Sequence, residues 1–259
     1  MTIQSFFDQL GNQVSYTHPP ERIISLVPSQ SELLADLGLE RQVVGITKYC
    51  VHPSHWLRTK TIIGGTKNFQ FDVIDDLKPD LIIGNKEENY AEGITRLKQK
   101  YPVWVSDIIT LPDVYSMISS LGQITGTETK ANVIKDQIAE RLRSVQKKST
   151  NSVLYLIWRK PWMAAGSGTF IDSMLKMLNL KNVLENVQRY PQLSTEQIAD
   201  LRANLIFLSS EPYPFRERHI GELKRISPMS QIMLVDGEMF SWYGSRLIKA
   251  ADYFNRLSF

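Results

Sequence analysis

Short runs of apolar, largely β-branched residues recur along the chain from Ile23 onward, and segments with helical spacing of apolar residues separate them. Such alternation is typical of βαβ units and parallel sheets. We therefore predict an α/β protein with mainly parallel sheets. The runs are IISLV (23–27), VVGIT (43–47), TIIGG (61–65), LIIGN (81–85), VWVSD (103–107), VLYLIW (153–158), LIFLSS (205–210) and QIMLVD (231–236).

The stretch between residues 111 and 148 contains no strand-like run. Its second part, 128–148, keeps apolar residues at helical spacing, which predicts one long helix of about five turns. A flexible linker would be rich in Gly or Pro, and this stretch has neither after Gly126. We predict two Rossmann-like lobes, 1–110 and 151–259, held nearly rigidly by connecting helices in 111–150. The residues of the helical pattern are Ala131, Ile134, Ile138, Leu142 and Val145.

The two halves also resemble each other. Residues 71–84 (FDVIDDLKPDLIIG) align without gaps on residues 195–208 (TEQIADLRANLIFL), and ELLADLGL at 32–39 echoes SMLKMLNL at 173–180. Any helix followed by a strand would give some similarity of this kind. We interpret the match as an internal repeat and expect two related lobes.

The charge is nearly balanced, with 30 basic and 27 acidic residues and no long run of one sign. Nucleic-acid recognition requires a clustered basic surface, so we expect no nucleic-acid partner. The single cysteine, Cys50, excludes an internal disulfide, and stability should not depend on an oxidising compartment.

The first residues show no basic start followed by an apolar stretch, and no cysteine stands at a lipid-attachment position. The longest apolar runs are far shorter than the ~20 residues of a membrane-spanning helix. From the sequence as it stands we expect no export and no membrane segment, and hence a cytoplasmic protein if Met1 is the native start.

Signatures of catalysis are missing, since the sequence has no GxGxxG after a strand, GxxxxGK[ST], GxSxG, HExxH or CxxC. We therefore expect a protein that is not an enzyme and has no covalent cofactor. Cys50, His52 and His55 lie within six positions and are residue types that bind zinc, copper or haem iron. The alternatives are a loop with a packed thiol and two exposed imidazoles, or a Cys nucleophile with a neighbouring His base.

Aromatic and cationic residues gather where predicted strands end. Ligands of open α/β sheets bind outside the carboxyl ends of the strands, so these side chains should lie near one place. Rings offer apolar faces and Arg can hold a carboxylate or phosphate, which suits a flat, anionic or metal-chelating ligand. The alternative is that some of the rings only pack in the core. The residues are Tyr49, Trp158, Arg159, Trp162, Trp242, Tyr243 and Arg246.

Asp72 and Glu196 occupy equivalent positions in the internal repeat, each near the start of a predicted helix. A carboxylate there interacts favourably with the helix dipole, which is one sufficient reason for its presence. If both are exposed, they would instead present one acid on each lobe to a two-fold-symmetric basic partner.

In combination and order, several segments resemble the helical-backbone, class III periplasmic binding proteins, which carry cobalamin, haem and iron–siderophore complexes to ABC importers. The cobalamin-binding branch is the most similar. The resemblance implies two lobes joined by a single long helix, with the ligand in an aromatic cleft. The segments are PERIISLVPSQSELLADLGL (20–39), VVGITKYCVHP (43–53), IIGGTKNFQFDVIDDLKPDLIIGNKEEN (62–89), YPQLSTEQIADL (190–201) and LVDGEMFSWYGSR (234–246).

By position, the resemblance implies a set of ligand-binding residues. Asp72 and Glu196 match the lobe carboxylates that family members present to arginines of the permease dimer. The residues that match cleft positions are Tyr49, Thr66 or Lys67, the loop 162–166, Tyr190, Trp242 and Arg246.

Two departures from the family pattern change the expectation. The resemblance implies a periplasmic protein, but the export signal or lipid-attachment cysteine of family members is not seen, so either the start is trimmed or this is a cytoplasmic offshoot. In addition, Thr66 and Lys67 stand where a cleft tryptophan is usual. Together with Arg159 and Lys160, this suggests a ligand more anionic than cobalamin.

We therefore predict a monomeric solute-binding protein of an ABC importer that binds a metal chelate or corrinoid between its lobes. The alternative is a cytoplasmic protein that senses, stores or modifies a metal or tetrapyrrole through Cys50, His52 or His55. A third class is an interaction module with no small ligand.

Overall fold

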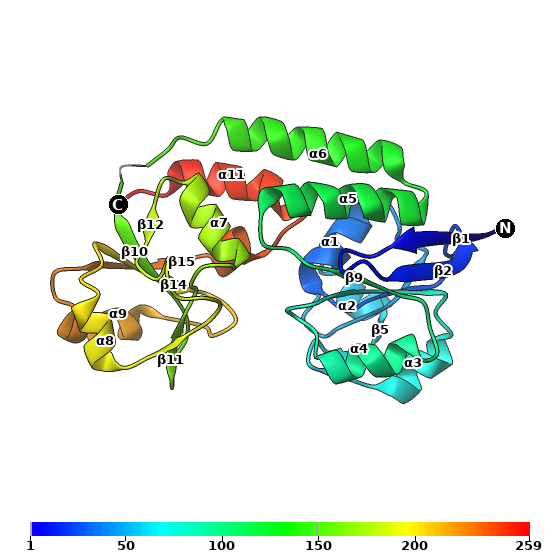
Figure 1. Cartoon of the computed structure of the whole chain (residues 1–259), viewed down its shortest axis with the longest axis horizontal. Helices are drawn as coiled ribbons and strands as arrows, with labels where there is room; N and C mark the ends of the chain where they lie inside the picture. The colour runs from blue at the N-terminus through cyan, green and yellow to red at the C-terminus, as the bar shows by residue number, and fades with distance from the viewer. Residues whose placement is uncertain (1, 149) are drawn as a thin grey trace. The chain divides into compact units, whose positions relative to one another are not determined.

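The computed structural model describes residues 2–148 and 150–259, and it divides into two compact units (Figure 1). Unit 1 comprises the residues up to Glu140 together with Tyr243–Arg246, and unit 2 comprises Arg141–Trp242 together with Leu247–Phe259. The predicted α/β class is confirmed. The chain first passes from unit 1 to unit 2 within one helix, and residues 111–140 are grouped with unit 1.

Unit 1 is built on a five-stranded sheet in which every pair of neighbours is parallel. Its strands coincide with the predicted apolar runs, and the central ones are buried on both faces, as parallel strands between helices must be. In sheet order the strands are β5 (Thr61–Ile62), β4 (Val43–Ile46), β3 (Ile23–Ser25), β8 (Leu81–Asn85) and β9 (Val103–Ser106).

Four short helices connect these strands: α1 (Pro28–Asp36), α2 (Trp56–Thr59), α3 (Phe71–Leu77) and α4 (Ala91–Lys98). Two longer helices follow. α5 (Leu111–Thr125) begins with a capping box between Thr110 and Asp113 and ends at Gly126, whose φ is 70°.

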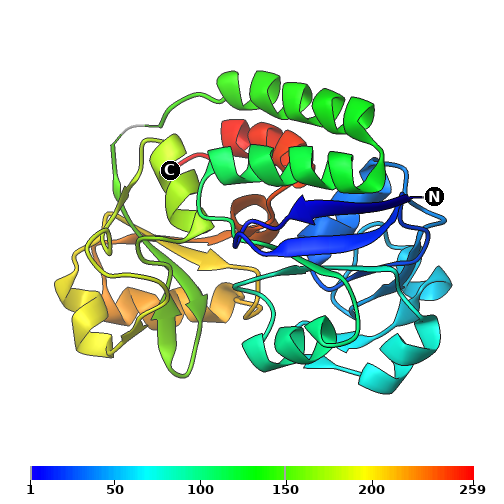
Figure 2. The ribbon, with the colours of Figure 1, turned by 45° about the vertical axis from the view of Figure 1, so that its right-hand side comes forward.

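The expected long helix is α6 (Glu128–Arg143), and it is shorter than predicted because residues 145–148 are not helical. It lies beside α5 in both ribbon views (Figures 1 and 2). A Cβ at Gly122 would come within 2.6 Å of the Ala131 Cβ, so only glycine permits this close approach. Lys135 Nζ also donates to Ser119 Oγ at 2.6 Å.

Two small antiparallel pairs in unit 1 were not predicted. The hairpin of β1 (Thr2–Phe7) and β2 (Gln13–His18) is held to the unit by distant partners, since Trp104 Nε1 donates to the Phe7 carbonyl at 3.1 Å and Tyr16 Oη to the Ile124 carbonyl at 2.7 Å. The second pair joins β6 (Gly64–Gly65) to β7 (Asn68–Phe69).

Unit 2 has a six-stranded mixed sheet. Its parallel part contains β12 (Lys181–Asn182), β10 (Ser152–Trp158), β14 (Leu205–Ser209) and β15 (Gln231–Val235). The antiparallel strands β11 (Trp162–Ala164) and β13 (Gln192–Leu193) extend it beyond β10. The helices are α7 (Phe170–Met177), α8 (Thr195–Asp200), α9 (Glu217–Ile226), α10 (Gly237–Ser241) and α11 (Arg246–Arg256).

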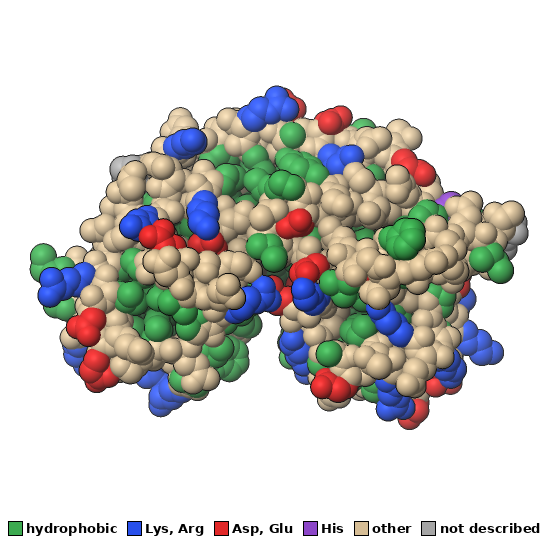
Figure 3. Space-filling model, viewed as in Figure 1, with side chains coloured by type: hydrophobic (Ala, Val, Ile, Leu, Met, Phe, Trp, Pro, Cys, Tyr) green, Lys and Arg blue, Asp and Glu red, His purple; other side chains and the backbone are tan. Residues whose placement is uncertain are grey.

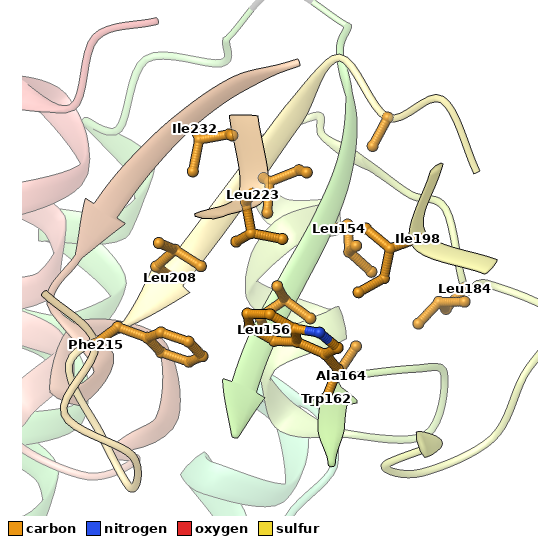
Figure 4. Packing of buried hydrophobic residues seen from close by; sticks show 12 residues of the cluster. Leu154, Leu156, Trp162, Ala164, Leu184, Ile198, Leu208, Phe215, Leu223 and Ile232 are labelled. Atoms are coloured by element: carbon orange, nitrogen blue, oxygen red, sulfur yellow. The ribbon is translucent and has the colours of Figure 1, made fainter. Parts of the chain in front are cut away.

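Both faces of this sheet are buried. On one face Leu154, Leu156 and Leu208 pack against Ile198 of α8 and Leu223 of α9 (Figure 4). Successive strand residues point to opposite faces, so the aromatic side chains of β10 and β14 form a second core. The rings of that core are Tyr155, Phe207 and Phe240, with centroids 5.2–6.3 Å apart.

Backbone geometry supports the predicted internal repeat. The aligned residues Lys78 and Arg202 both follow their helices in the left-handed conformation, with φ of 46° and 45°. In the second aligned pair of segments, Gly38 and Asn179 correspond and have φ of 84° and 64°. In both units, therefore, a residue in the left-handed conformation connects the helix to the following strand.

The left-handed residues suggest a stability test. Replacing Lys78 or Arg202 by Gly should raise the free energy of unfolding by up to about 1 kcal/mol, because the left-handed conformation costs a residue with a Cβ roughly 1–2 kcal/mol and Gly costs roughly 0.5–1 kcal/mol of chain entropy. Urea denaturation measures the change. Lys78→Ala and Arg202→Ala are the matched controls, since they keep the Cβ, and Gly variants no more stable than these would contradict the prediction.

Candidate functional site

The carboxyl edge of the unit 1 sheet presents an exposed aromatic ring. Tyr49 follows β4, is 51% exposed, and has Lys48 Nζ 5.1 Å from its ring centroid. A Cβ at Gly65 would lie 3.2 Å from Tyr49 Cε2, so the glycine leaves room for the ring. An exposed ring with a cation beside it is a suitable platform for a flat ligand.

Thr66 and Lys67 lie in the turn between β6 and β7, beside this ring. The Thr66 carbonyl accepts a hydrogen bond from Asn89 Nδ2 at 3.1 Å, and Lys67 Nζ donates to the Glu87 carbonyl at 2.6 Å. Both partners follow β8, so the β6–β7 turn is tied to the loop after β8. The structure thus brings Tyr49, Thr66 and Lys67 to one edge of unit 1.

Cys50, His52 and His55 do not assemble. Cys50 is fully buried, its Sγ lies 3.0 Å from Ser31 Oγ and 3.2 Å from Thr47 Oγ1, and burial raises the pKa of its thiol. His55 is exposed, with Nε2 3.3 Å from Glu40. Within residues 2–148 and 150–259, no group of three His, Cys, Asp or Glu side chains is placed to hold a metal ion.

Tyr243 and Arg246 belong to unit 1 and are buried. Arg246 is 5% exposed, and its Nε donates to Glu32 Oε2 at 2.8 Å. Tyr243 Oη donates to Glu88 Oε1 at 3.1 Å, and burial raises the pKa of this tyrosine. These contacts anchor the segment 243–246 in unit 1, and a role for either residue in ligand binding stays a prediction.

In unit 2 the exposed ring is Trp158, at the carboxyl end of β10. It is 39% exposed and packs edge-on against Tyr213, with centroids 5.6 Å apart. Trp162 instead lies in the core, with its ring parallel to that of Phe215 (Figure 4). Tyr190 is half-buried, and the Arg189 guanidinium lies 5.9 Å from its ring centroid.

Trp242 is also largely buried, at 7% exposed. Its Nε1 donates to Glu211 Oε1 at 2.8 Å, and Ser241 Oγ donates to the same oxygen at 2.7 Å. Burial raises the pKa of Glu211, while the two hydrogen bonds oppose that shift. The indole N–H of Trp242 therefore provides a hydrogen bond to the buried carboxylate of Glu211 in unit 2. The predicted contact of Trp242 with a ligand stays a prediction.

Unit 2 contains a basic pocket that was not predicted from the sequence. The cavity has a volume of about 380 Å³ and is lined by Arg159, Arg218, His219, Glu222 and Arg225. Four of these residues belong to α9, and among them Arg218, Glu222 and Arg225 are spaced by four and three, which places their side chains on one helical face. This helical spacing could have been recognised in the sequence. The position of Arg159 beside these residues could not, because it depends on the fold.

Asp72 and Glu196 are both exposed in the first turns of α3 and α8. The capping box of α8 is formed by Ser194 and Gln197, so capping does not require Glu196. Glu196 Oε2 accepts from Ser194 Oγ at 2.7 Å, and this hydrogen bond lowers the pKa of the carboxyl group.

Asp72 lines a second pocket, of about 440 Å³, on unit 1. The Arg96 guanidinium lies 3.7 Å from the Phe71 ring centroid in the same pocket. Each unit thus presents an exposed carboxylate at the repeat-equivalent position.

The sequence model of the family described as "Periplasmic binding protein" matches residues 23–228. The chain belongs to the periplasmic binding protein family. This confirms the predicted resemblance, and with it a solute-binding function. Charged side chains of both signs are dispersed over the visible face (Figure 3). Among the described residues of this periplasmic binding protein, no helix is long and apolar enough to cross a membrane.

Individual relatives are binding proteins. An uncharacterized ABC transporter substrate-binding lipoprotein of Bacillus subtilis, YvrC, is 28% identical over 213 residues, covering 77% of this chain and 67% of the relative. The vitamin B12-binding protein of Vibrio parahaemolyticus is 25% identical over 197 residues, covering 74% and 71%. The periplasmic haem-binding protein RhuT of Roseiflexus sp. RS-1 shares the fold, with a TM-score of 0.78 at 19% identity over 90% and 96% of the chains.

The buried ion pair of this periplasmic binding protein gives a second prediction. Arg246→Met should lower the free energy of unfolding by about 3–5 kcal/mol, because it removes the guanidinium that pairs with the buried Glu32 carboxylate. The double variant Glu32→Leu/Arg246→Met should recover a large part of that loss in urea denaturation. The control Arg256→Gln, at an exposed position of α11, should change stability by no more than about 0.5 kcal/mol. A double variant as unstable as the single one would refute this role of the pair.

Proposed function

We propose that this protein is the substrate-binding component of an ABC importer and that it carries a metal chelate or corrinoid. The observation that carries the proposal is the exposed aromatic ring at the carboxyl edge of the parallel sheet in each unit, Tyr49 in one and Trp158 in the other. The names of relatives that bind vitamin B12 and haem support this ligand class.

Stacking accounts for the choice of ligand. A planar macrocycle or chelate offers apolar faces that exclude water against a ring, and such contacts are among the strongest single contributions at binding sites. Trp158 is held by Tyr213, and Tyr49 is confined beside Gly65, so little side-chain entropy is lost on binding. No reacting group is required for this function.

The alternative of a metal sensor that uses Cys50 receives less support. A metal-binding thiol must lose its proton, whereas burial raises the pKa of Cys50 and its sulfur is engaged by two hydroxyl groups. We therefore favour transport. The implied location is outside the cytoplasmic membrane, which the family description and the lipoprotein relative support.

Ligand binding tests the proposal. Tryptophan fluorescence and thermal shift should find one ligand among cyanocobalamin, haem and ferric siderophores, and Tyr49→Ala or Trp158→Ala should weaken its binding at least roughly tenfold, or about 1.4 kcal/mol. Tyr49→Phe and Trp158→Phe should retain most of the affinity because they keep a ring. Phe7→Ala, which removes an exposed ring on β1, is the control. Full affinity in both Ala variants would contradict the proposed role of these rings.

We further propose that Asp72 and Glu196 dock the protein onto basic residues of a permease dimer. The double variant Asp72→Asn/Glu196→Gln should bind its ligand normally but lose roughly tenfold or more in affinity for the importer, measured with the transporter in lipid nanodiscs.

The matched control is Asp76→Asn/Asp200→Asn. These two exposed acids lie on the same two helices and also correspond in the repeat. If both double variants weaken docking equally, general charge and not these positions governs the interaction.

A further inference from the structure

The basic pocket of unit 2 has an excess of positive charge that no described residue neutralises. Its lining contains three arginines against one glutamate, and the only ion pair within it joins Arg159 to Glu222 among the residues the structure describes. Burial and the neighbouring Arg218 lower the pKa of His219, so this imidazole adds no positive charge at neutral pH. The cavity is therefore suited to an anion.

The Arg159–Glu222 pair holds one guanidinium in a defined position. Arg159 Nε donates to Glu222 Oε2 at 2.8 Å and Nη2 donates to Oε1 at 2.7 Å. This two-point contact orients the planar group and leaves Nη1 outside the pair. Hydrogen bonding from Arg159 also lowers the pKa of Glu222, which keeps the carboxylate ionised.

Arg218 and Arg225 flank Glu222 on the same face of α9, four residues before it and three after it. Both are exposed, and neither has a carboxylate partner among residues 2–148 and 150–259. Arg218 Nε donates to His219 Nε2 at 3.4 Å. Arginines without a carboxylate partner, beside one already oriented, form a site where an incoming oxyanion can make several charge-assisted hydrogen bonds.

The pocket adjoins the aromatic platform of unit 2. Arg159 directly follows Trp158, and Tyr213 contacts both Trp158 and His219, with centroids 5.6 and 5.5 Å apart. A ligand that stacks on Trp158 can therefore reach the pocket with a short side chain.

We propose that this pocket binds a carboxylate or phosphate group of the transported ligand, so that the ligand is an anionic chelate. The statement that the bound group belongs to a transported ligand rests on the proposed function. The oxyanion site itself stands on the geometry of unit 2. A volume of about 380 Å³ accommodates more than one carboxylate, so polycarboxylate chelates are the favoured class.

The site can be tested without knowing the ligand. The full chain is titrated with citrate and with inorganic phosphate at constant ionic strength, by calorimetry and by NMR. Wild-type protein should bind one of them, and Arg218→Gln/Arg225→Gln should bind it at least tenfold more weakly. The charge-matched control Arg143→Gln/Arg256→Gln, two exposed arginines of unit 2, should bind like wild type.

The preferred probe identifies the group, carboxylate for citrate or phosphate for the inorganic ion. No binding by wild type, or equal loss in both double variants, would overturn the inference. Equal loss would mean that the probe senses only overall charge.

A second titration separates this inference from the proposed function, with haem, ferric citrate and cyanocobalamin as ligands. An anionic chelate that binds wild type and is weakened at least tenfold by Arg218→Gln/Arg225→Gln supports both proposals. A chelate that binds both proteins equally leaves the transport proposal intact and overturns the pocket's role. If no chelate binds but citrate still distinguishes the variants, the oxyanion site stands and the proposed function fails.

Discussion

Burial of both faces of the parallel sheets is the constraint on which the rest of this structure depends. Helices cover the sheets, so the central strands carry apolar side chains in both directions, and no polar group can be displayed from within a strand without a cost of several kcal/mol per charge. Chemistry is thereby confined to the loops at the strand ends. Tyr49, Lys67 and the arginines of the basic pocket lie on such loops or on the helices that follow them, and Trp158 is the last residue of its strand. The sheets thus determine where a ligand can bind, and the loop residues determine which ligand binds there.

The same constraint explains why the two units could diverge in their loops and still share a backbone plan. Lys78 and Arg202 keep a left-handed turn at corresponding positions although neither is the glycine that would adopt it most easily. The aligned core residues Ile74 and Ile198 are likewise both buried. By contrast, the neighbourhoods of the exposed rings differ, with lysines in unit 1 and an arginine-rich pocket in unit 2.

Local patterns made much of the fold predictable. Runs such as LIIGN and LIFLSS could only be buried strands, and the helical spacing of 128–143 was read correctly except for its end. The β1–β2 hairpin escaped notice because its outer strand is mostly exposed and its anchors, Trp104 and Ile124, are remote in sequence.

At the candidate site, the sequence indicated Arg246 and Trp242 as candidate ligand-binding residues but did not reveal their hydrogen-bond partners. Arg246 pairs with Glu32, 214 positions away, and Trp242 pairs with Glu211, 31 positions away. Cys50 was open between a packed thiol, a metal ligand and a nucleophile, and its burial favours packing.

The short segment Tyr243–Arg246 has a consequence for biosynthesis. It belongs to unit 1 although the residues before and after it belong to unit 2, so neither unit is encoded by one continuous stretch. The first 140 residues leave the ribosome well before Arg246, which pairs with Glu32, is synthesised. Unit 1 therefore cannot form all of its internal contacts until the residues of unit 2 up to Trp242 have been synthesised.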